Sequence, residues 1–339
     1  MTKGAPRLAG LLLLSLLLLG MAVWGVLALY YFDHQSAGVR TGFAAAFAVA
    51  SVAALAGFAR SRWRWRAFTL YVVLFALLLW RWFAIEPSND REWQPEVAVL
   101  PYATFDGDRI TVHNIRNFDY RSETDFTPGY YDKTFDLRQL DSVDLVTSYW
   151  MGPHIAHTLL SFGFGGKDYL AISIETRKEK GESYSTVAGF FRQYELYYVV
   201  ADERDVIRVR TNYRRDPPED VYVYRVSGRV ENGRNLFLGY LQKINALTEH
   251  PEFYNTLTTN CTTNIWMHTR VNPGHPPFSW RMLASGHVPA LLYQSGRLDN
   301  SVPFAELQRR SHINARAQAA DKAEDFSQRI RGTAALAAH

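Results

Sequence analysis

Hydrophobic residues dominate the first quarter of the chain in three blocks. Residues 8–31 and 41–59 contain no charge, and residues 67–85 contain only Arg81, near one end. A helix needs about 20 apolar residues to cross a bilayer. The pattern therefore predicts three transmembrane helices, over about 8–31, 41–59 and 67–85. The first block is too long for the apolar core of a cleaved signal peptide, which has about 7 to 15 residues.

The charges that flank these blocks predict an orientation. Lys3 and Arg7 precede the first block, and the connector at 60–66 between the second and third blocks holds four arginines. Positively charged loops stay on the cytoplasmic side of a membrane. We therefore expect a multi-pass protein of a bacterial inner membrane, with a cytoplasmic N-terminus and a large C-terminal part in the periplasm.

From about residue 87 the pattern changes to short runs of β-branched and aromatic residues separated by turn residues. The runs at 97–102 and 109–114 flank Asp106-Gly107-Asp108 and predict a hairpin. Alternation within the run 169–176 places Ile172 and Ile174 on a core face, and Ser173 and Glu175 on the opposite, polar face. Further strands are predicted at 143–150, 154–164, 195–200, 206–211 and 220–226.

Helical periodicity follows the strands. Leucine, isoleucine and tyrosine recur at helical spacing over 232–248, and Thr258-Thr259-Asn260 supplies capping residues before a short helix over 261–270. Strands first and helices later predict an α+β domain. We expect a membrane domain over 1–86, an extracytoplasmic domain over 87–310 and a helical or frayed tail over 311–339.

The charge distribution limits the classes of partner. Residues 1–85 hold eight Lys or Arg and one acidic residue, whereas the rest of the chain holds 29 basic and 32 acidic residues. The isoelectric point near 9.0 therefore comes from the charges beside the apolar blocks. A basic surface for nucleic acid is excluded on this ground. A content of 47% hydrophobic and 21% charged residues also excludes a disordered chain.

Cys261 is the only cysteine, and it falls in the part of the chain predicted to lie in an oxidising compartment. An unpaired thiol there is an inert buried side chain, half of an intermolecular disulfide, or a reactive group. Cys261 opens a predicted helix, where backbone N–H groups and the helix dipole stabilise a thiolate. The same N–H groups can hold an oxyanion. Position alone leaves the structural and the nucleophilic alternatives open.

A thiolate nucleophile needs a base, and His157 is the best-placed histidine. It lies in the predicted strand 154–164, where a rigid sheet can hold its ring against a helix N-terminus. His268 shares the helix face of Cys261 but lies about 10 Å further along the axis. His154 would point to the opposite side of the strand.

Two further interpretations concern the neighbours of the histidine. Glu175 is a candidate to orient His157, and the alternative for Glu175 is a surface ion pair with Arg177 or Lys178. Zinc bound by His154, His157 and Cys261 is a weaker alternative, because no pair of these residues has diagnostic ligand spacing. We expect neither a metal nor a cofactor.

The order of these motifs resembles that of circularly permuted papain-like enzymes such as NlpC-type peptidases and lecithin retinol acyltransferase relatives. A histidine strand, His157 to Phe162, precedes Asn260-Cys261 at a helix start. More closely, residues 89–298 are similar to the Lnb N-terminal periplasmic domain family. The motifs that carry this resemblance are Asn114–Arg121, Phe135–Leu137, Val143–Trp150, Ile174–Glu179 and Asn260-Cys261.

The resemblance implies an α+β domain of permuted papain-like fold. In it Cys261 would be the acyl-accepting nucleophile and His157 the general base. The family is named after a lipoprotein acyltransferase, so a lipoprotein or a membrane lipid is the implied substrate. One departure is that three apolar blocks precede the domain here, whereas the name-giving enzymes carry membrane helices after it.

The sequence thus predicts a membrane-anchored Cys/His acyltransferase or hydrolase that acts on an acyl or amide substrate at the outer face of the membrane. The alternatives are an envelope peptidase or amidase with the same pair, and a non-catalytic binding protein with a buried cysteine. Arg116, Arg121 and Asn260 are candidates for substrate binding, because guanidinium and amide groups suit anionic and polar groups. For the two arginines, ordinary salt bridges with Asp119 are the alternative.

Overall fold

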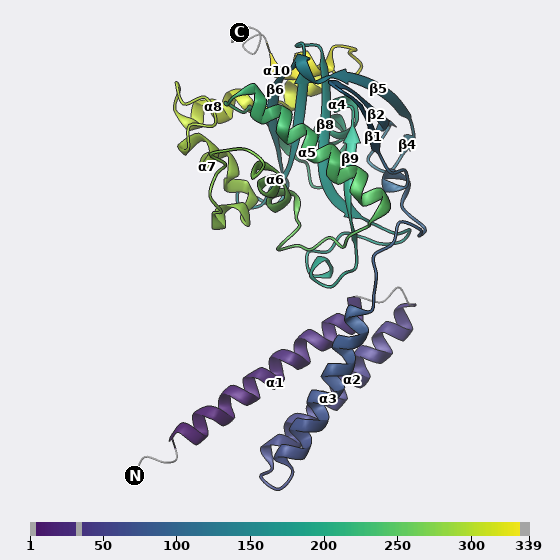
Figure 1. The fold of residues 1–339 in the computed structure, drawn as a ribbon, viewed down its shortest axis with the longest axis vertical. Coiled ribbons are helices and arrows are strands. Elements are labelled where there is room, and N and C mark those ends of the chain that lie inside the picture. The colour runs from purple at the N-terminus through teal and green to yellow at the C-terminus, as the bar shows by residue number, and fades with distance from the viewer. Residues whose placement is uncertain (1–4, 32–35, 333–339) are drawn as a thin grey trace. The chain divides into compact units, whose positions relative to one another are not determined.

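The computed structural model describes residues 5–31 and 36–332, so Lys3 lies outside the described residues. The chain forms two compact units. The first comprises the residues up to Ser88 together with Tyr184–Glu195, and the second comprises Asn89–Ser183 together with the residues from Leu196 onward. Figure 1 shows helices in the first unit and a mixture of strands and helices in the second.

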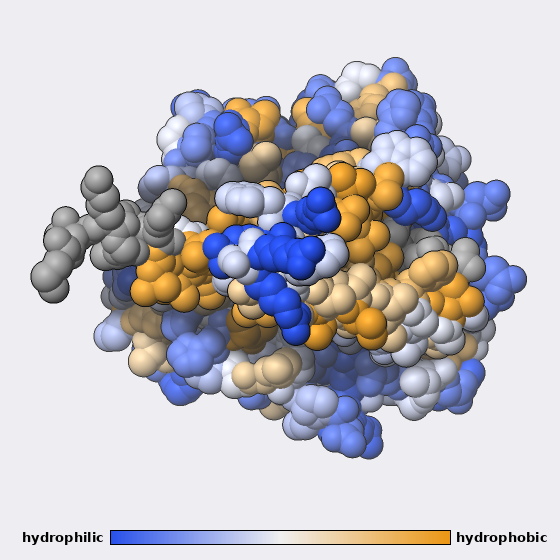
Figure 2. All heavy atoms as spheres, turned by 90° about the horizontal axis from the view of Figure 1, so that it is seen from below, coloured by the Kyte–Doolittle hydropathy of each residue, from blue (hydrophilic) through white to orange (hydrophobic). Residues whose placement is uncertain are grey.

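Three N-terminal apolar helices are confirmed. They are α1 (Ala5–Tyr31), α2 (Ala37–Ala59) and α3 (Arg64–Phe83), and each is long and apolar enough to span a membrane. Gly25 leaves room for the Phe47 ring between α1 and α2, and the Ser51 and Tyr71 hydroxyls hydrogen-bond at 2.9 Å between α2 and α3. The outward side chains are uncovered, as lipid-facing residues would be. Figure 2 shows broad hydrophobic areas on one face of the molecule, with hydrophilic side chains among them.

An eight-stranded sheet forms the centre of the second unit. Its order is β1-β2-β9-β8-β7-β6-β10, with β5 also paired to β2, and β3 and β4 form a separate two-stranded sheet. The pairs β1/β2, β2/β5, β6/β7, β7/β8 and β6/β10 are antiparallel, whereas β2 and β9 are parallel. The strands are β1 (Tyr102–Asp106), β2 (Arg109–Arg116), β3 (Asp119–Tyr120), β4 (Phe126–Thr127), β5 (Tyr130–Asp136), β6 (Leu140–Tyr149), β7 (His157–Phe164), β8 (Asp168–Arg177), β9 (Glu195–Ala201) and β10 (Asp220–Arg225).

Helices cover both faces of this sheet. On one face lie α5 (Val230–Glu249), which crosses β1 and β6, and α6 (Cys261–Thr269), which packs on β7 and β8 (Figure 1). The Phe162 ring contacts Phe237 of α5 at a centroid distance of 5.1 Å. The opposite face is covered by α4 (Glu203–Val206), α9 (Asn314–Ala319) and α10 (Phe326–Arg331). Two short helices, α7 (Val288–Gln294) and α8 (Phe304–Ser311), complete the unit.

The strand pattern predicts the core of β8 well. Ile172 and Ile174 are at most 1% exposed, as expected. The opposite face is not solvent-exposed, because the α4, α9 and α10 layer covers it and Ser173 has no exposed surface. A strand with both faces buried can therefore still alternate between apolar and polar residues when the polar side chains find partners.

Two predicted strands are wrong or displaced. The run 206–211 is helical, with α4 ending at Val206 and a π-helical turn over Val209–Tyr213. Asp202 caps α4 by accepting a hydrogen bond from the Arg204 N–H at 2.9 Å. The alternation of apolar residues with arginines in this run mimics a half-exposed strand, yet Arg210 is buried against acids. In the first hairpin, the strand predicted at 97–102 begins only at Tyr102, because Pro95 opens a 3₁₀ turn before it.

The residues after 310 complete the core of the second unit. Ile313, Ala317, Phe326 and Ile330, from and around α9 and α10, are fully buried and pack against β6, β7 and β9 side chains. Residues 333–339 lie outside the described part of the chain. The helices α9 and α10 thus belong to the layer that covers the polar face of β8.

Candidate active site

The cysteine lies at the first residue of α6. Asn260 is the N-cap, and its Oδ1 accepts a hydrogen bond from the Thr263 N–H at 2.8 Å. Its Nδ2 donates to the Thr256 carbonyl at 2.8 Å. The oxygen and the nitrogen of the Asn260 amide are therefore both engaged in fixing the helix start, and the Cys261 side chain lies partly exposed in the first turn.

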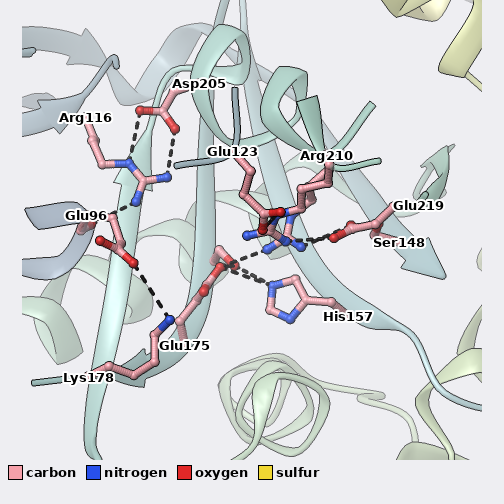
Figure 3. A network of polar contacts seen from close by, with 12 residues as sticks. Glu96, Arg116, Glu123, Ser148, His157, Glu175, Lys178, Asp205, Arg210 and Glu219 are labelled. Atoms are coloured by element: carbon pink, nitrogen blue, oxygen red, sulfur yellow. Dashed lines mark hydrogen bonds and ion pairs between the residues drawn. The ribbon is translucent and has the colours of Figure 1, made fainter. Parts of the chain in front are cut away.

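The histidine lies at the first residue of β7, next to β8. Its Nε2 is 2.6 Å from the Ser173 hydroxyl and 3.5 Å from the Glu175 Oε1 (Figure 3). The Ser173 hydroxyl donates to the same Glu175 oxygen at 2.8 Å. Ser173 and Glu175 are alternate residues of one strand, so both point to the side on which the ring lies. The carboxylate therefore holds the imidazole both directly and through the serine hydroxyl.

The thiol and the imidazole interact. Burial alone would raise the pKa of Cys261, but a hydrogen bond with His157, the charge of its ring and hydrogen bonds from Thr158 lower the pKa to about 6. The hydroxyls of Thr158 and Thr262 are 3.0 Å apart and join the start of β7 to the start of α6. Tertiary packing thus brings together the cysteine, the histidine and the glutamate named from the sequence.

A chain of buried charges extends behind the glutamate. Arg210 donates to Glu175 at 3.0 Å and lies 3.3 Å from Glu219, which also accepts from Arg214 at 2.7 Å (Figure 3). Burial tends to raise the pKa of Glu175, but the charges of His157, Arg210 and Arg214 and the hydrogen bond from Ser173 hold it far below its usual range. Glu175 is therefore a fixed negative charge next to the imidazole.

The alternative partners considered for Glu175 are wrong. Arg177 shares the strand face of Glu175, but its guanidinium lies further along the strand, 4.2 Å from the Trp93 ring centre, and donates to the Val97 carbonyl. Lys178 lies 3.7 Å from Glu96. Arg210, from the π-helical turn, pairs with Glu175 instead. The local sequence around β8 does not predict this pair.

The two arginines named as binding candidates both pair with acidic residues. Arg116 is buried and makes a bidentate pair with Asp205, with N–O distances of 3.0 and 2.7 Å. The charge of Asp205 raises the pKa of Arg116 above its usual value despite burial, and Asp119 is not the partner. Arg121 is exposed and pairs with Asp125. Both guanidinium groups are thus engaged in ion pairs within the domain.

The other histidines considered have different partners. His268 bonds to the Tyr198 hydroxyl at 2.8 Å, and His154 lies in the loop before β7, 2.9 Å from the His287 ring nitrogen. Within residues 5–31 and 36–332, no group of three or more His, Cys, Asp or Glu side chains is placed to hold a metal ion.

An apolar cavity adjoins the site. Its volume is about 170 Å³, and Thr158 and Thr262, the residues that directly follow His157 and Cys261, form part of its wall. The apolar part of the lining includes Leu145, Leu160, Leu236, Ile265, Met282 and Leu291. The sequence pattern marks these residues only as core positions, so the cavity has no signal in the sequence. Arg210 likewise has no signal in the sequence that marks it as a site residue. Ser173 does have one, because it shares a strand face with Glu175.

The three candidate spans and the α+β unit define a membrane protein that carries a thiol whose pKa an imidazole lowers. Residues 126–286 match the family model described as the Lnb N-terminal periplasmic domain, so the family expected from the sequence is confirmed. The match contains His157, Ser173, Glu175 and Cys261, and begins after the Asn114–Arg121 block. Together with the three candidate spans, it indicates a membrane protein whose C-terminal domain is periplasmic. No curated protein and no solved structure matches the chain.

Proposed function

We propose that the protein is a thiol acyltransferase or hydrolase in which Cys261 is the nucleophile and His157 the general base. The observation that carries the proposal is the thiol at the start of α6, whose pKa His157 and Thr158 lower to about 6. A nucleophile activated by a base, with the base oriented by a third group, is the usual arrangement of covalent catalysis. Here the orienting group is Glu175, acting directly and through Ser173.

The reaction follows from these groups. The Cys261 thiolate attacks the carbonyl carbon of the donor, and backbone N–H groups at the start of α6 stabilise the oxyanion. The bond from the carbonyl to the donor oxygen, nitrogen or sulfur then breaks, and His157 returns the proton to that leaving atom. Water, an amine or a hydroxyl next attacks the thioester while His157 takes its proton. The thiol is restored, and the acyl group has moved to the acceptor.

The cavity favours an acyl substrate over a peptide. Its apolar side chains come from β6, β7, α5, α6 and the segment around α7, and Thr158 and Thr262, which follow His157 and Cys261 in the chain, form part of its wall. Hydrocarbon is stabilised by these apolar side chains, whereas a peptide backbone needs hydrogen-bond partners that they do not supply. The three helices further support a lipid-borne donor, such as a lipoprotein or a phospholipid, because they confine the enzyme to the surface that carries it.

Two finer points belong to the same proposal. The domain is of permuted papain-like type, because the strand with His157 precedes the helix with Cys261 in the chain. The N-terminus faces the cytoplasm of a bacterial inner membrane, because the connector between α2 and α3 carries four arginines within residues 60–66.

The test is to trap the acyl-enzyme. The full chain in lipid nanodiscs is incubated with a phospholipid or with a diacylated lipopeptide, and intact mass spectrometry then detects an acyl group bound to Cys261 that neutral hydroxylamine removes. We expect the adduct in the wild-type protein, a strong loss in His157→Ala, and no loss in the control His154→Ala, whose ring contacts His287 instead. Cleavage of envelope peptides without any acyl adduct would instead support a peptidase. A thiol inert to both substrates would support a binding protein.

A further inference from the structure

The segment Tyr184–Glu195, here called the β8–β9 loop, belongs to the unit that contains the membrane helices. The Phe191 ring is almost fully buried in the cluster that α1 and α3 form. Its centroid lies 6.3 Å from Trp24, 6.0 Å from Tyr31 and 6.2 Å from Trp82. A segment of the periplasmic part of the chain is therefore seated among the aromatic side chains at the outer ends of two helices.

Arg192 fixes the loop to the C-terminal end of α3. Its Nη1 donates to the Trp82 carbonyl at 2.8 Å and to the Ile85 carbonyl at 3.2 Å. The guanidinium also lies 5.1 Å from the Trp82 ring centre and 5.5 Å from that of Phe83. The last carbonyls of a helix lack partners within the helix, and a positive charge is stabilised there. The contacts of Arg192 therefore fix the position of the β8–β9 loop along the axis of α3.

This position along α3 corresponds to the bilayer interface. Trp80 and Phe83, in the last turn of α3, are 71% and 70% exposed. Exposed aromatic residues at the end of a spanning helix are typical of the boundary between hydrocarbon and headgroups. Because Arg192 binds the same turn, the β8–β9 loop reaches this boundary as well.

The loop presents uncovered apolar side chains of its own. A single 3₁₀ turn, Ala188–Phe190, begins with the Phe190 N–H donating to the Val187 carbonyl at 3.0 Å. Val187 and Phe190 are 44% and 41% exposed. They are three residues apart, so this turn places them on one side. No acidic residue occurs from Tyr184 to Tyr194, which suits a surface of lipid headgroups and acyl chains.

We propose that the β8–β9 loop is a membrane-contact site whose occupant is the outer leaflet of the bilayer, entered by Val187 and Phe190. The continuity of the loop with the helix ends, through Phe191 and Arg192, makes lipid the partner rather than another protein. The proposal concerns binding alone and does not depend on the chemistry of Cys261.

The test uses the single cysteine of the chain. In a Cys261→Ala background, Phe190→Cys is spin-labelled in lipid nanodiscs, and its accessibility to oxygen is compared with that to a water-soluble nickel chelate. Oxygen concentrates in lipid, and the chelate is excluded from it. Phe83→Cys is the lipid-exposed reference. Met267→Cys on α6, 47% exposed, is the reference on the second unit.

We expect the label at 190 to have an oxygen-to-nickel ratio several-fold above that at 267 and close to that at 83. Val187→Cys provides a second position in case the first variant does not fold, with the same expected result. A ratio equal to that at 267 would overturn the proposal, because the loop would then lie in water. Low accessibility to both reagents would overturn it as well, because protein would then cover the loop.

Discussion

The sharpest prediction concerns the replacement His157→Ala and the reactivity of Cys261. In the wild-type protein, His157 and Thr158 outweigh burial and lower the pKa of the thiol to about 6. The alanine variant loses the hydrogen bond and charge of the ring but keeps the burial. The pKa should then return to at least the ordinary value of about 8.5.

The magnitude follows from these two values. At pH 7 about 90% of the thiol is ionised with a pKa near 6, and about 3% with a pKa near 8.5, a roughly 30-fold difference. A thiolate of higher pKa is intrinsically more nucleophilic, with a Brønsted coefficient of about 0.4–0.5, which restores about 10- to 18-fold. The rate at pH 7 should therefore fall only about two- to threefold. The diagnostic quantity is the midpoint of the pH profile.

The assay is the rate of iodoacetamide alkylation of the folded full chain between pH 4 and pH 10. Cys261 is the only cysteine, so the rate reports on it alone. Because the thiol is an acid, wild-type reactivity should be lost as the pH falls through about 6. In the variant, reactivity should already be lost below about 8.5. The control His154→Ala should keep the wild-type midpoint. Equal midpoints in wild type and His157→Ala would refute the coupling of the two side chains.

Three further predictions test the surroundings of the pair. Ser173→Ala removes the hydroxyl between His157 and Glu175 but leaves the direct 3.5 Å contact, so the alkylation midpoint should rise by less than in His157→Ala. Arg116→Met leaves the buried Asp205 carboxylate without its bidentate partner, so the free energy of unfolding measured by chemical denaturation should fall by about 3–5 kcal/mol. Arg121→Ala should leave the denaturation midpoint unchanged, because its pair with Asp125 is exposed. If Arg116→Met were equally stable but did not bind substrate, Arg116 would belong to the binding site. Ile265→Trp fills the cavity and should reduce the yield of long-chain acyl-enzyme, while alkylation of Cys261 persists. The control Met267→Trp, on the exposed side of α6, should leave the yield unchanged. Equal acyl-enzyme yields in wild type and Ile265→Trp would exclude the cavity as the acyl site.

Local patterns predicted much of the fold correctly. Three apolar blocks, with Arg81 as their single charge, predict the three helices, because a helix that faces lipid must be largely apolar along its length. Alternation in β8 predicts the buried Ile172 and Ile174, and the capping residues before Cys261 predict the start of α6. The strand predicted over 206–211 is wrong, because buried arginines there have the spacing of the exposed positions of a strand. Whether an arginine can be buried depends on acids supplied by distant segments.

The sequence by itself determined the membrane anchoring, the β-rich periplasmic part and the placement of one cysteine at a helix start, because each depends on residues close together in the chain. Only the tertiary structure decided the surroundings of that cysteine. Residues 157 and 261 come from separate elements, and the packing of α6 on β7 sets the pKa of the thiol. The link through Ser173, the Arg210 contact and the apolar cavity arise in the same way. Burial and charge at a site are sums over neighbours that the chain brings together only when it folds.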